Sequence, residues 1–416
     1  MQVYDAVIIG AGPAGLAAAI QCRENNLNVV VLDEYPKAGG RLLGQLYQEP
    51  DGTWWNGIEE SKALETKAEQ LDTDIRLGVS VHHIETLDNQ FVVHTKKENF
   101  TTKNVIIATG AAESPVPVPG WTLPGVMSIG AAQVMTNVHR VKVGEKGIIV
   151  GINVLSAAIA QELHLAGIEL HSMVLPAKHI VSGEQANPRK VMDDLSQVAH
   201  LAPSKFIQFG SKFAKYKWAQ NLALQFYPKN GIKMWEMPIH LRKAIKQING
   251  TEKVESVTLV DVTADGEIVE HSEEEVQVDF VCIAGGLYPL AELAAVVGCP
   301  FQYSEELGGH VPIHNERMET PIPGIYVAGN ITGIESAKVA REQGIVAGLS
   351  IAKKESDSPD IIEEKLQTAI ENVKATRKAA TIQFHPNIPE GRANVSAAFS
   401  KIIDEQKTET TKEKIS

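Results

Sequence analysis

The chain has 416 residues, of which 44% are hydrophobic and 22% are charged, and its formal net charge at pH 7 is −12. This length predicts two or three domains, and the composition is typical of a globular protein with a full core. The acidic balance argues against nonspecific binding to nucleic acid or to an anionic membrane surface.

The cysteines and the N-terminus restrict the chemistry and the compartment. No two of the three cysteines, Cys22, Cys282 and Cys299, lie within four residues of each other. This spacing excludes a CxxC redox pair, a zinc ribbon and a four-Cys iron–sulfur site built from this chain alone, and the low count fits a reducing cytosol. The sequence begins with a strand instead of a signal peptide and contains no apolar run of 18 residues. We therefore expect a cytoplasmic protein with no metal site and no transmembrane segment.

The N-terminal residues predict a dinucleotide-binding unit. Residues 4–9 predict a buried parallel strand, residues 16–25 a helix and residues 28–33 a second strand. The turn between the first strand and the helix contains Gly10, Gly12, Pro13, Ala14 and Gly15. This order of strand, glycine turn, helix, strand and acid is the Rossmann pattern.

Each element of that pattern has a physical role. Gly10 lets the chain turn off the strand, Gly12 lets a pyrophosphate approach bare backbone, and Gly15 lets the helix pack closely on the sheet. The pyrophosphate then lies at the positive end of the helix dipole. Asp33 or Glu34 can accept hydrogen bonds from ribose hydroxyls, and Asp33 is the better spaced, with 17 residues between it and Gly15.

Two later blocks favour FAD over NAD as the cofactor of this unit. Gly40 and Arg41 follow the acidic pair, where a glycine turn lets the backbone pass close to the flavin or its phosphates. A predicted strand in residues 103–111 ends at Ala108, Thr109 and Gly110, and these small residues permit a close approach to the cofactor.

A third block, residues 322–348, completes the predicted flavin site. It predicts a strand that ends at Gly329 and Asn330, followed by a helix that begins near Ser336 and includes Ala337. The Asn330 side chain can bond the ribityl chain. The N-terminus of the helix would face the electron-rich side of the isoalloxazine ring and stabilise the reduced anion.

In these blocks the sequence resembles the two-dinucleotide-domain flavoprotein oxidoreductases, which include thioredoxin and glutathione reductases. The resemblance implies an α/β fold with two Rossmann-like domains, the second inserted in the first. We expect an FAD domain formed by residues 1–120 and 275–355 and a second, NAD-type domain at 121–274. Family members usually have an acid where Asn330 stands. Disulfide reduction is not expected, because the two thiols that it needs beside the flavin are missing.

The second glycine turn is degenerate. Residues 147–151 predict a strand that enters Gly151, but Asn153 places a side chain where a pyrophosphate needs bare backbone. Ser156 is small enough for helix packing. The next strand, residues 168–177, ends without an acid for a ribose hydroxyl. We expect the fold to persist here while NAD(P) binding is weak or lost.

A closer resemblance rests on residues 31–41, 106–127 and 329–348 and on a predicted helical insert at about 186–228. These segments resemble the FAD-containing subunits of multisubunit amino-acid and amine dehydrogenases. This family includes the hydrogen cyanide synthase B, opine oxidase A and proline/hydroxyproline dehydrogenase α types and part of the sarcosine oxidase α subunit. The resemblance spans roughly residues 1–355.

The resemblance implies a subunit that relays electrons within an amine or imino-acid dehydrogenase acting on proline, hydroxyproline, sarcosine, glycine or an opine. Its implied partners are a small [2Fe–2S] protein and a glycine-oxidase-like flavin subunit. Many members carry a four-Cys segment near the C-terminus, and this chain does not, so any [2Fe–2S] cluster must lie on a partner. Two alternatives remain: a stand-alone NAD(P)H-dependent flavin reductase that feeds a protein such as ferredoxin, and a non-catalytic flavin-bound assembly scaffold.

The sequence identifies no catalytic residue. The 13 histidines show no metal spacing such as HExxH, and no Ser–His–Asp or Cys–His arrangement can be argued from spacing. Residues 356–416 predict a C-terminal helix followed by a disordered tail at 404–416. The apolar stripe of this helix consists of Ile361, Ile362, Leu366, Ile370 and Val373.

Overall fold

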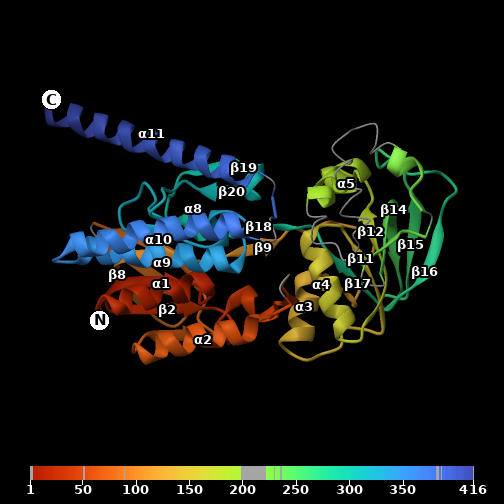
Figure 1. Cartoon of the computed structure of the whole chain (residues 1–416), viewed down its shortest axis with the longest axis horizontal. Coiled ribbons are helices and arrows are strands. Elements are labelled where there is room, and N and C mark those ends of the chain that lie inside the picture. The colour runs from red at the N-terminus through yellow and green to blue at the C-terminus, as the bar shows by residue number, and fades with distance from the viewer. Residues whose placement is uncertain are drawn as a thin grey trace. The chain divides into compact units, whose positions relative to one another are not determined.

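A computed structural model describes residues 3–49, 52–88, 90–197, 222–228, 230–234, 237–380, 384–385 and 387–415. The chain forms two compact units (Figure 1). The first unit comprises Met1–Leu43, Asn56–Ala112 and Leu287–Ser416, and the second comprises Gly44–Trp55 and Glu113–Gly286. Both contain parallel β-sheets with helices, as expected for an α/β fold.

The sheet of the first unit has the strand order β5-β2-β1-β8-β7-β6, and β21 also pairs with β8. Strands β5, β2, β1, β8 and β21 run parallel, whereas β6, β7 and β8 form an antiparallel meander. The bounds of these strands are β1 (Val3–Ile9), β2 (Val29–Asp33), β5 (Asp74–Leu77), β6 (Val81–Leu87), β7 (Gln90–Thr95), β8 (Asn99–Ile107) and β21 (Ile325–Val327).

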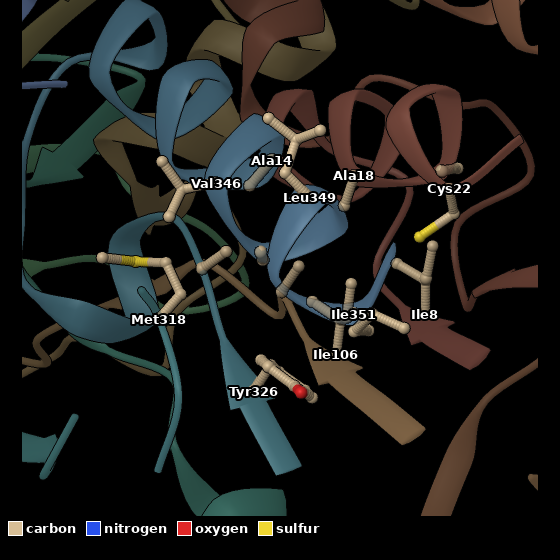
Figure 2. Packing of buried hydrophobic residues seen from close by; sticks show 14 of the residues in the cluster. Ile8, Ala14, Ala18, Cys22, Ile106, Met318, Tyr326, Val346, Leu349 and Ile351 are labelled. Atoms are coloured by element: carbon tan, nitrogen blue, oxygen red, sulfur yellow. The ribbon is translucent and has the colours of Figure 1, made fainter. Parts of the chain in front are cut away.

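The described helices of the first unit are α1 (Pro13–Glu24), α2 (Gly57–Gln70), α8 (Glu292–Val296), α9 (Ala337–Glu355), α10 (Pro359–Ala379) and α11 (Ile388–Ile415). Helices α1 and α9 pack closely because α9 presents glycine at the contact. A side chain at Gly344 would lie 2.0 Å from the carbonyl oxygen of Ala14, and one at Gly348 would lie 2.6 Å from that of Ala18. Figure 2 shows Ala14 and Ala18 beside α9, above Ile106 of the sheet.

The C-terminal extension is helical as far as Ile415, where the sequence predicts a disordered tail at 404–416. Helix α10 buries Ile362, Leu366, Ile370 and Val373 of the predicted stripe, while Ile361 is exposed. Helix α11 continues to Ile415. Its last turns are rich in Glu, Lys and Gln, which favour helix, and Lys401 and Glu405 form an i,i+4 ion pair of 3.9 Å.

The second unit contains a sheet of order β10-β17-β11-β12-β14-β15-β16, with β13 also paired to β14. Strands β10, β17, β11, β12 and β14 are parallel, and β14, β15 and β16 are antiparallel. Their bounds are β10 (Val126–Ser128), β11 (Lys146–Val150), β12 (Glu169–Pro176), β13 (Ile232–Met234), β14 (Met237–Asn249), β15 (Ser256–Asp261), β16 (Glu274–Gln277) and β17 (Phe280–Ile283).

Helices α3 (Ile129–Asn137), α4 (Val154–Leu165) and α5 (Pro188–Gln197) belong to the second unit. Helix α5 lies within the expected helical insert at 186–228, but residues 198–221 of that insert are outside the described part of the chain. The shorter elements of the molecule are β3 (Leu46–Gln48), β4 (Trp54–Asn56), β9 (Ala111–Glu113), β18 (Leu287–Pro289), β19 (Phe301–Ser304), β20 (Gly309–Pro312), η1 (Gly40–Gly44), η2 (Gly183–Ala186), η4 (Glu305–Leu307) and η5 (Asn330–Thr332).

The segment Gly44–Trp55 is part of the second unit although it follows the first βαβ motif in sequence. Glu162 of α4 explains this placement. Its carboxylate accepts hydrogen bonds from the Leu46 backbone N–H at 3.2 Å and from the Asn137 amide at 2.6 Å. Asn137 also donates to the Gly44 carbonyl at 2.7 Å. Helices α3 and α4 therefore both hydrogen-bond the start of this segment.

Candidate functional site

The predicted flavin-site residues of the first unit lie at one edge of its sheet. Strands β1, β2, β8 and β21 are parallel, so their carboxyl ends meet at the same edge. Gly10, Asp33, Ala108 and Gly329 follow or end these four strands. In open α/β sheets this edge is the place where ligands bind.

The glycine turn after β1 has two kinds of glycine. Gly10 has φ +108°, which favours glycine. At Gly15 the backbone of Gly10 comes so close that a side chain would lie 1.8 Å from the Gly10 carbonyl oxygen. Gly12, in contrast, has φ −76°, and a side chain there would meet no protein atom within 4 Å. The fold therefore requires Gly10 and Gly15, whereas Gly12 leaves open space beside the helix.

The N-terminus of α1 is free of competing groups. Its N-cap is Gly12, no side chain caps it, and its first turn contains no acidic residue. Pro13 occupies the first helical position, where its fixed φ suits the helix and no N–H is needed. Ala14 follows, and the open space at Gly12 and the uncapped helix end fit the pyrophosphate of a dinucleotide.

Asp33 closes the turn from the end of β2. Its carboxylate accepts hydrogen bonds from the backbone N–H of Ala11 at 2.6 Å and from that of Tyr35 at 2.8 Å. Burial raises the pKa of Asp33, and the two N–H donors oppose that effect. Glu34 is exposed, so Asp33 is the acid that the fold holds against the glycine turn.

The turn at Gly40 lies against the turn at Gly12. Gly40 has φ +54°, and a side chain there would lie 3.4 Å from the Cα atom of Gly12. Arg41 donates from Nε to the Ala111 carbonyl at 3.0 Å, which ties this turn to the chain after β8. At the end of β8, the Thr109 hydroxyl donates to the Leu290 carbonyl at 2.5 Å. Gly110 has φ +77°, and a side chain there would meet no protein atom within 4 Å.

A hydrogen bond from Gly329 to Gln343 of α9 fixes the conformation of the chain after β21. Gly329 has φ +81°, and its N–H donates to Oε1 of Gln343 at 2.9 Å. The Asn330 side chain accepts from the Glu335 backbone N–H at 3.3 Å, which shapes the loop that leads to Ala337 at the start of α9. The Ser336 hydroxyl caps this helix by accepting from Val339 N–H at 3.4 Å.

The second turn, after β11, is built differently. Gly151 has φ +107°, and a side chain there would lie 2.2 Å from the Ala284 carbonyl oxygen, so this glycine is needed by the fold. Asn153 is the N-cap of α4: its Oδ1 accepts from the Ser156 N–H at 2.9 Å, and its Nδ2 donates to the Ala284 carbonyl at 2.9 Å. The Ser156 hydroxyl accepts from Asn153 N–H at 2.9 Å. A side chain of the protein thus occupies the helix end that a pyrophosphate would use.

The cysteines lie where they cannot act as redox thiols. All three are buried, and burial raises the pKa of Cys22 and Cys282 to about 12 and that of Cys299 to about 11. Reactive cysteines need an accessible thiolate, which these environments disfavour. Among the described residues no three His, Cys, Asp or Glu side chains gather to hold a metal ion. Nor does any helix in those ranges have the length and apolar character needed to cross a membrane.

Two buried polar clusters could not be found from the sequence. The first is Glu162 with its partners in the second unit. The second joins the loop after Asn330 to the C-terminal helices: Glu335 pairs with Arg377 of α10 at 2.5 Å and with Arg392 of α11. Glu335 and Arg392 are 57 positions apart, and no sequence pattern links them.

Comparison with known proteins now identifies the family. The model of the family described as pyridine nucleotide-disulphide oxidoreductase matches residues 4–199 and 220–344. The A-type subunit of opine oxidase from Agrobacterium tumefaciens (strain Ach5) is 27% identical over 365 residues, which cover 83% of this chain and 65% of that protein. The chain thus spans about two thirds of the length of this relative.

A second relative is the ferredoxin–NADP reductase of Halalkalibacterium halodurans (strain ATCC BAA-125 / DSM 18197 / FERM 7344 / JCM 9153 / C-125). It is 26% identical, with 79% of this chain and 86% of that protein covered. Among solved structures, L-proline dehydrogenase from P. horikoshii has a TM-score of 0.62 at 22% identity, covering 88% of this chain and 59% of that one. At this identity the likeness shows the fold alone.

These matches confirm the predicted fold class, the resemblance to opine oxidase A and the assignment as an oxidoreductase. The matched family residues include both glycine turns and the chain after β21. The chain therefore belongs to the pyridine nucleotide-disulphide oxidoreductase family and is an FAD-type oxidoreductase.

Proposed function

We propose that this chain is the electron-relaying FAD subunit of a multisubunit amine or imino-acid dehydrogenase. The observation that carries the proposal is the contrast between the two glycine turns. The first has an uncapped helix and open space at Gly12, whereas the Asn153 side chain fills the second. This contrast supports an electron donor other than NAD(P)H.

In this proposal the first unit holds FAD. The N–H groups at the start of α1, with Gly12 and Gly15, hold the pyrophosphate. Asp33, with Glu34 beside it, accepts from the ribose hydroxyls. Gly40 and Arg41 line the phosphates or the flavin.

The remaining predicted residues surround the flavin itself. Ala108, Thr109, Gly110 and Gly329 would allow its close approach, and the Asn330 side chain would bond the ribityl chain. The N-terminus of α9 at Ala337 stabilises negative charge on the ring. When bound, FAD supplies the redox chemistry, and the protein supplies binding, orientation and electrostatic field. No side chain of the chain is assigned as a general acid or base.

The partner assignment rests on the relatives. Opine oxidase A is by name a subunit, which supports a multisubunit assembly for this chain. As partners in the cytoplasm we propose a small [2Fe–2S] protein and a glycine-oxidase-like flavin subunit that oxidises the amine. Proline, hydroxyproline, sarcosine, glycine and opines are the candidate substrates.

The second candidate function is a stand-alone NAD(P)H-dependent flavin reductase. The similarity to a ferredoxin–NADP reductase, which is matched over 86% of its length, favours it. The closed turn at Asn153 counts against it. A third candidate is a flavin-bound scaffold that assembles partner proteins without turnover.

One experiment separates the three candidates. The tagged chain is isolated from its source cells with its partners, and its flavin is exposed anaerobically to each candidate amine and to NADPH. Reduction by one amine in the complex, but not in the isolated chain, supports the relay. Rapid reduction of the isolated chain by NADPH followed by electron transfer to ferredoxin establishes the reductase, and reduction by none of these donors leaves the scaffold.

A further inference from the structure

The C-terminal helices α10 and α11 border an open cavity beside α9. It has a volume of about 870 Å³ and is bordered by the segment from His314 to Met318 and by α9, α10 and α11. All of these elements belong to the first unit. Small-molecule sites in proteins have volumes of about 300–1,000 Å³, so this cavity has room for such a ligand.

The cavity wall carries excess positive charge. Its ionisable side chains, apart from one histidine, are the cations Lys374, Arg377, Lys378 and Arg392 and the carboxylates Glu316 and Glu335. The histidine, His314, adds no charge, because burial and the nearby Arg392 lower its pKa to about 3. The wall therefore has two more positive than negative charges, which favours an anion.

Arg392 is held in place but is not fully used. One terminal nitrogen donates to the Thr332 carbonyl at 2.6 Å and contacts Nε2 of His314 at 3.3 Å, and the other pairs with Glu335. Its Nε is buried and has no hydrogen-bond partner within the described part of the chain. A guanidinium fixed by three neighbours with one donor left over is preorganised for a further acceptor.

Gln343 of α9 also lines the cavity, and its Nε2 is a second donor without a partner among the described residues. The residue is only 1% exposed. Its Oε1 accepts from Gly329 N–H at 2.9 Å and from the Thr332 hydroxyl at 3.3 Å, and these contacts fix the orientation of the amide. Its Nε2 is buried and finds no acceptor among the described residues. Buried donors without partners are costly, so both point to an acceptor that the protein itself does not supply.

Beside the polar residues Asn315, Ser336, Ser396 and Ser400, the wall has an apolar part that would contact the body of a ligand. This part consists of Met318, Val339, Ile370, Val373, Phe384 and Ile388. We propose that the cavity binds a small organic monocarboxylate with an apolar body, whose carboxylate accepts from Arg392 and Gln343.

Calorimetry with three probe pairs tests the site on the full chain. The probes are benzoate, 4-phenylbutanoate and octanoate, each with its neutral amide. We expect at least one carboxylate to bind, about tenfold more tightly than its amide, the ratio expected for one hydrogen bond to a charged group. Equal binding of acid and amide, or binding of no carboxylate below about 1 mM, a weak-affinity threshold, overturns the proposal.

Two tryptophan variants on α11 locate the binding. Ala397 is exposed and lines the cavity, so Ala397→Trp should fill it without disturbing the buried ion pairs and should abolish carboxylate binding. Asn394 is exposed on the same helix and does not line the cavity, so Asn394→Trp should bind as the wild type does. Unchanged binding by Ala397→Trp in a folded variant, checked by circular dichroism, overturns the assignment of the site.

Discussion

Asn153 and Ser156 hydrogen-bond each other reciprocally across the first turn of α4, each side chain accepting from the backbone N–H of the other. This capping box satisfies two of the N–H groups that a helix leaves unpaired at its start. The corresponding turn of α1 has no side-chain cap. The two Rossmann turns of one chain thus differ in whether the protein or a ligand completes the helix end.

Replacement of Asn153 should therefore cost stability in the second unit. We expect Asn153→Ala to lower the free energy of unfolding by about 1 kcal/mol, and Asn153→Gly by only a few tenths. Tryptophan fluorescence during urea unfolding reports on this unit through Trp54, Trp55 and Trp121, which belong to it. Equal stability of the wild type and Asn153→Ala would show that the cap contributes nothing.

Gly12 and Gly15 should respond differently to the same substitution. Because a methyl group at Gly12 meets no protein atom within 4 Å, the Gly12→Ala apoprotein should lose no more than about 1 kcal/mol of stability, the cost of alanine at a helix N-cap. The same methyl group should obstruct the pyrophosphate, so this variant should purify with much less FAD. Flavin absorbance per chain and thermal unfolding of the apoprotein measure the two effects.

Gly15→Ala is the matched control for packing. Its methyl group would lie 1.8 Å from the Gly10 carbonyl oxygen. We expect a loss of about 3 kcal/mol or more, as for other overpacked sites, and little soluble protein. If Gly12→Ala retained full FAD content, the assignment of this turn to the pyrophosphate would be wrong.

Glu162 should make the stability of the second unit depend on pH. Burial raises its pKa to about 7, so ionisation is less favourable in the folded chain than in the unfolded one. The wild type should accordingly lose up to about 3 kcal/mol relative to Glu162→Gln as the pH rises from about 5 to about 8. Urea unfolding followed by tryptophan fluorescence gives both curves. Glu252→Gln, at an exposed position of the same unit, should track the wild type, and a parallel response of Glu162→Gln would contradict the prediction.

The three thiols should be unreactive in the folded protein. Cys22, Cys282 and Cys299 are buried with raised pKa values, so Ellman's reagent should label none of them under native conditions and all three in urea. Blocking reagents should leave flavin reduction unchanged. Fast native labelling coupled to loss of activity would reopen a thiol-based mechanism.

The parts of the fold that the sequence predicted well are local. The β1–α1–β2 unit, the strand ending at Ile107 and the helix starting at Ala337 depend on neighbouring residues whose periodicity and glycine spacing are visible in the sequence. Asn153 was also identifiable, because a side chain at a pyrophosphate position is a local conflict. The capping box that it forms with Ser156 adds the physical reason for that conflict.

The parts that the sequence did not predict depend on distant partners. The attachment of Gly44–Trp55 to the second unit relies on a hydrogen bond between Leu46 and Glu162, which are 116 positions apart. The Glu335–Arg392 pair and the cavity beside it require α10 and α11 to fold back on α9. Helix α11 runs to Ile415, although the high charge of residues 404–416 alone predicts disorder.

Anaerobic stopped-flow reduction of the FAD-loaded chain by NADH and NADPH tests the central claim most directly. We predict that bleaching near about 450 nm is absent or takes minutes, far slower than ordinary enzyme turnover. Bleaching that is complete within about a second, on the usual turnover scale, would contradict the closed second turn and make the protein a nicotinamide-dependent reductase.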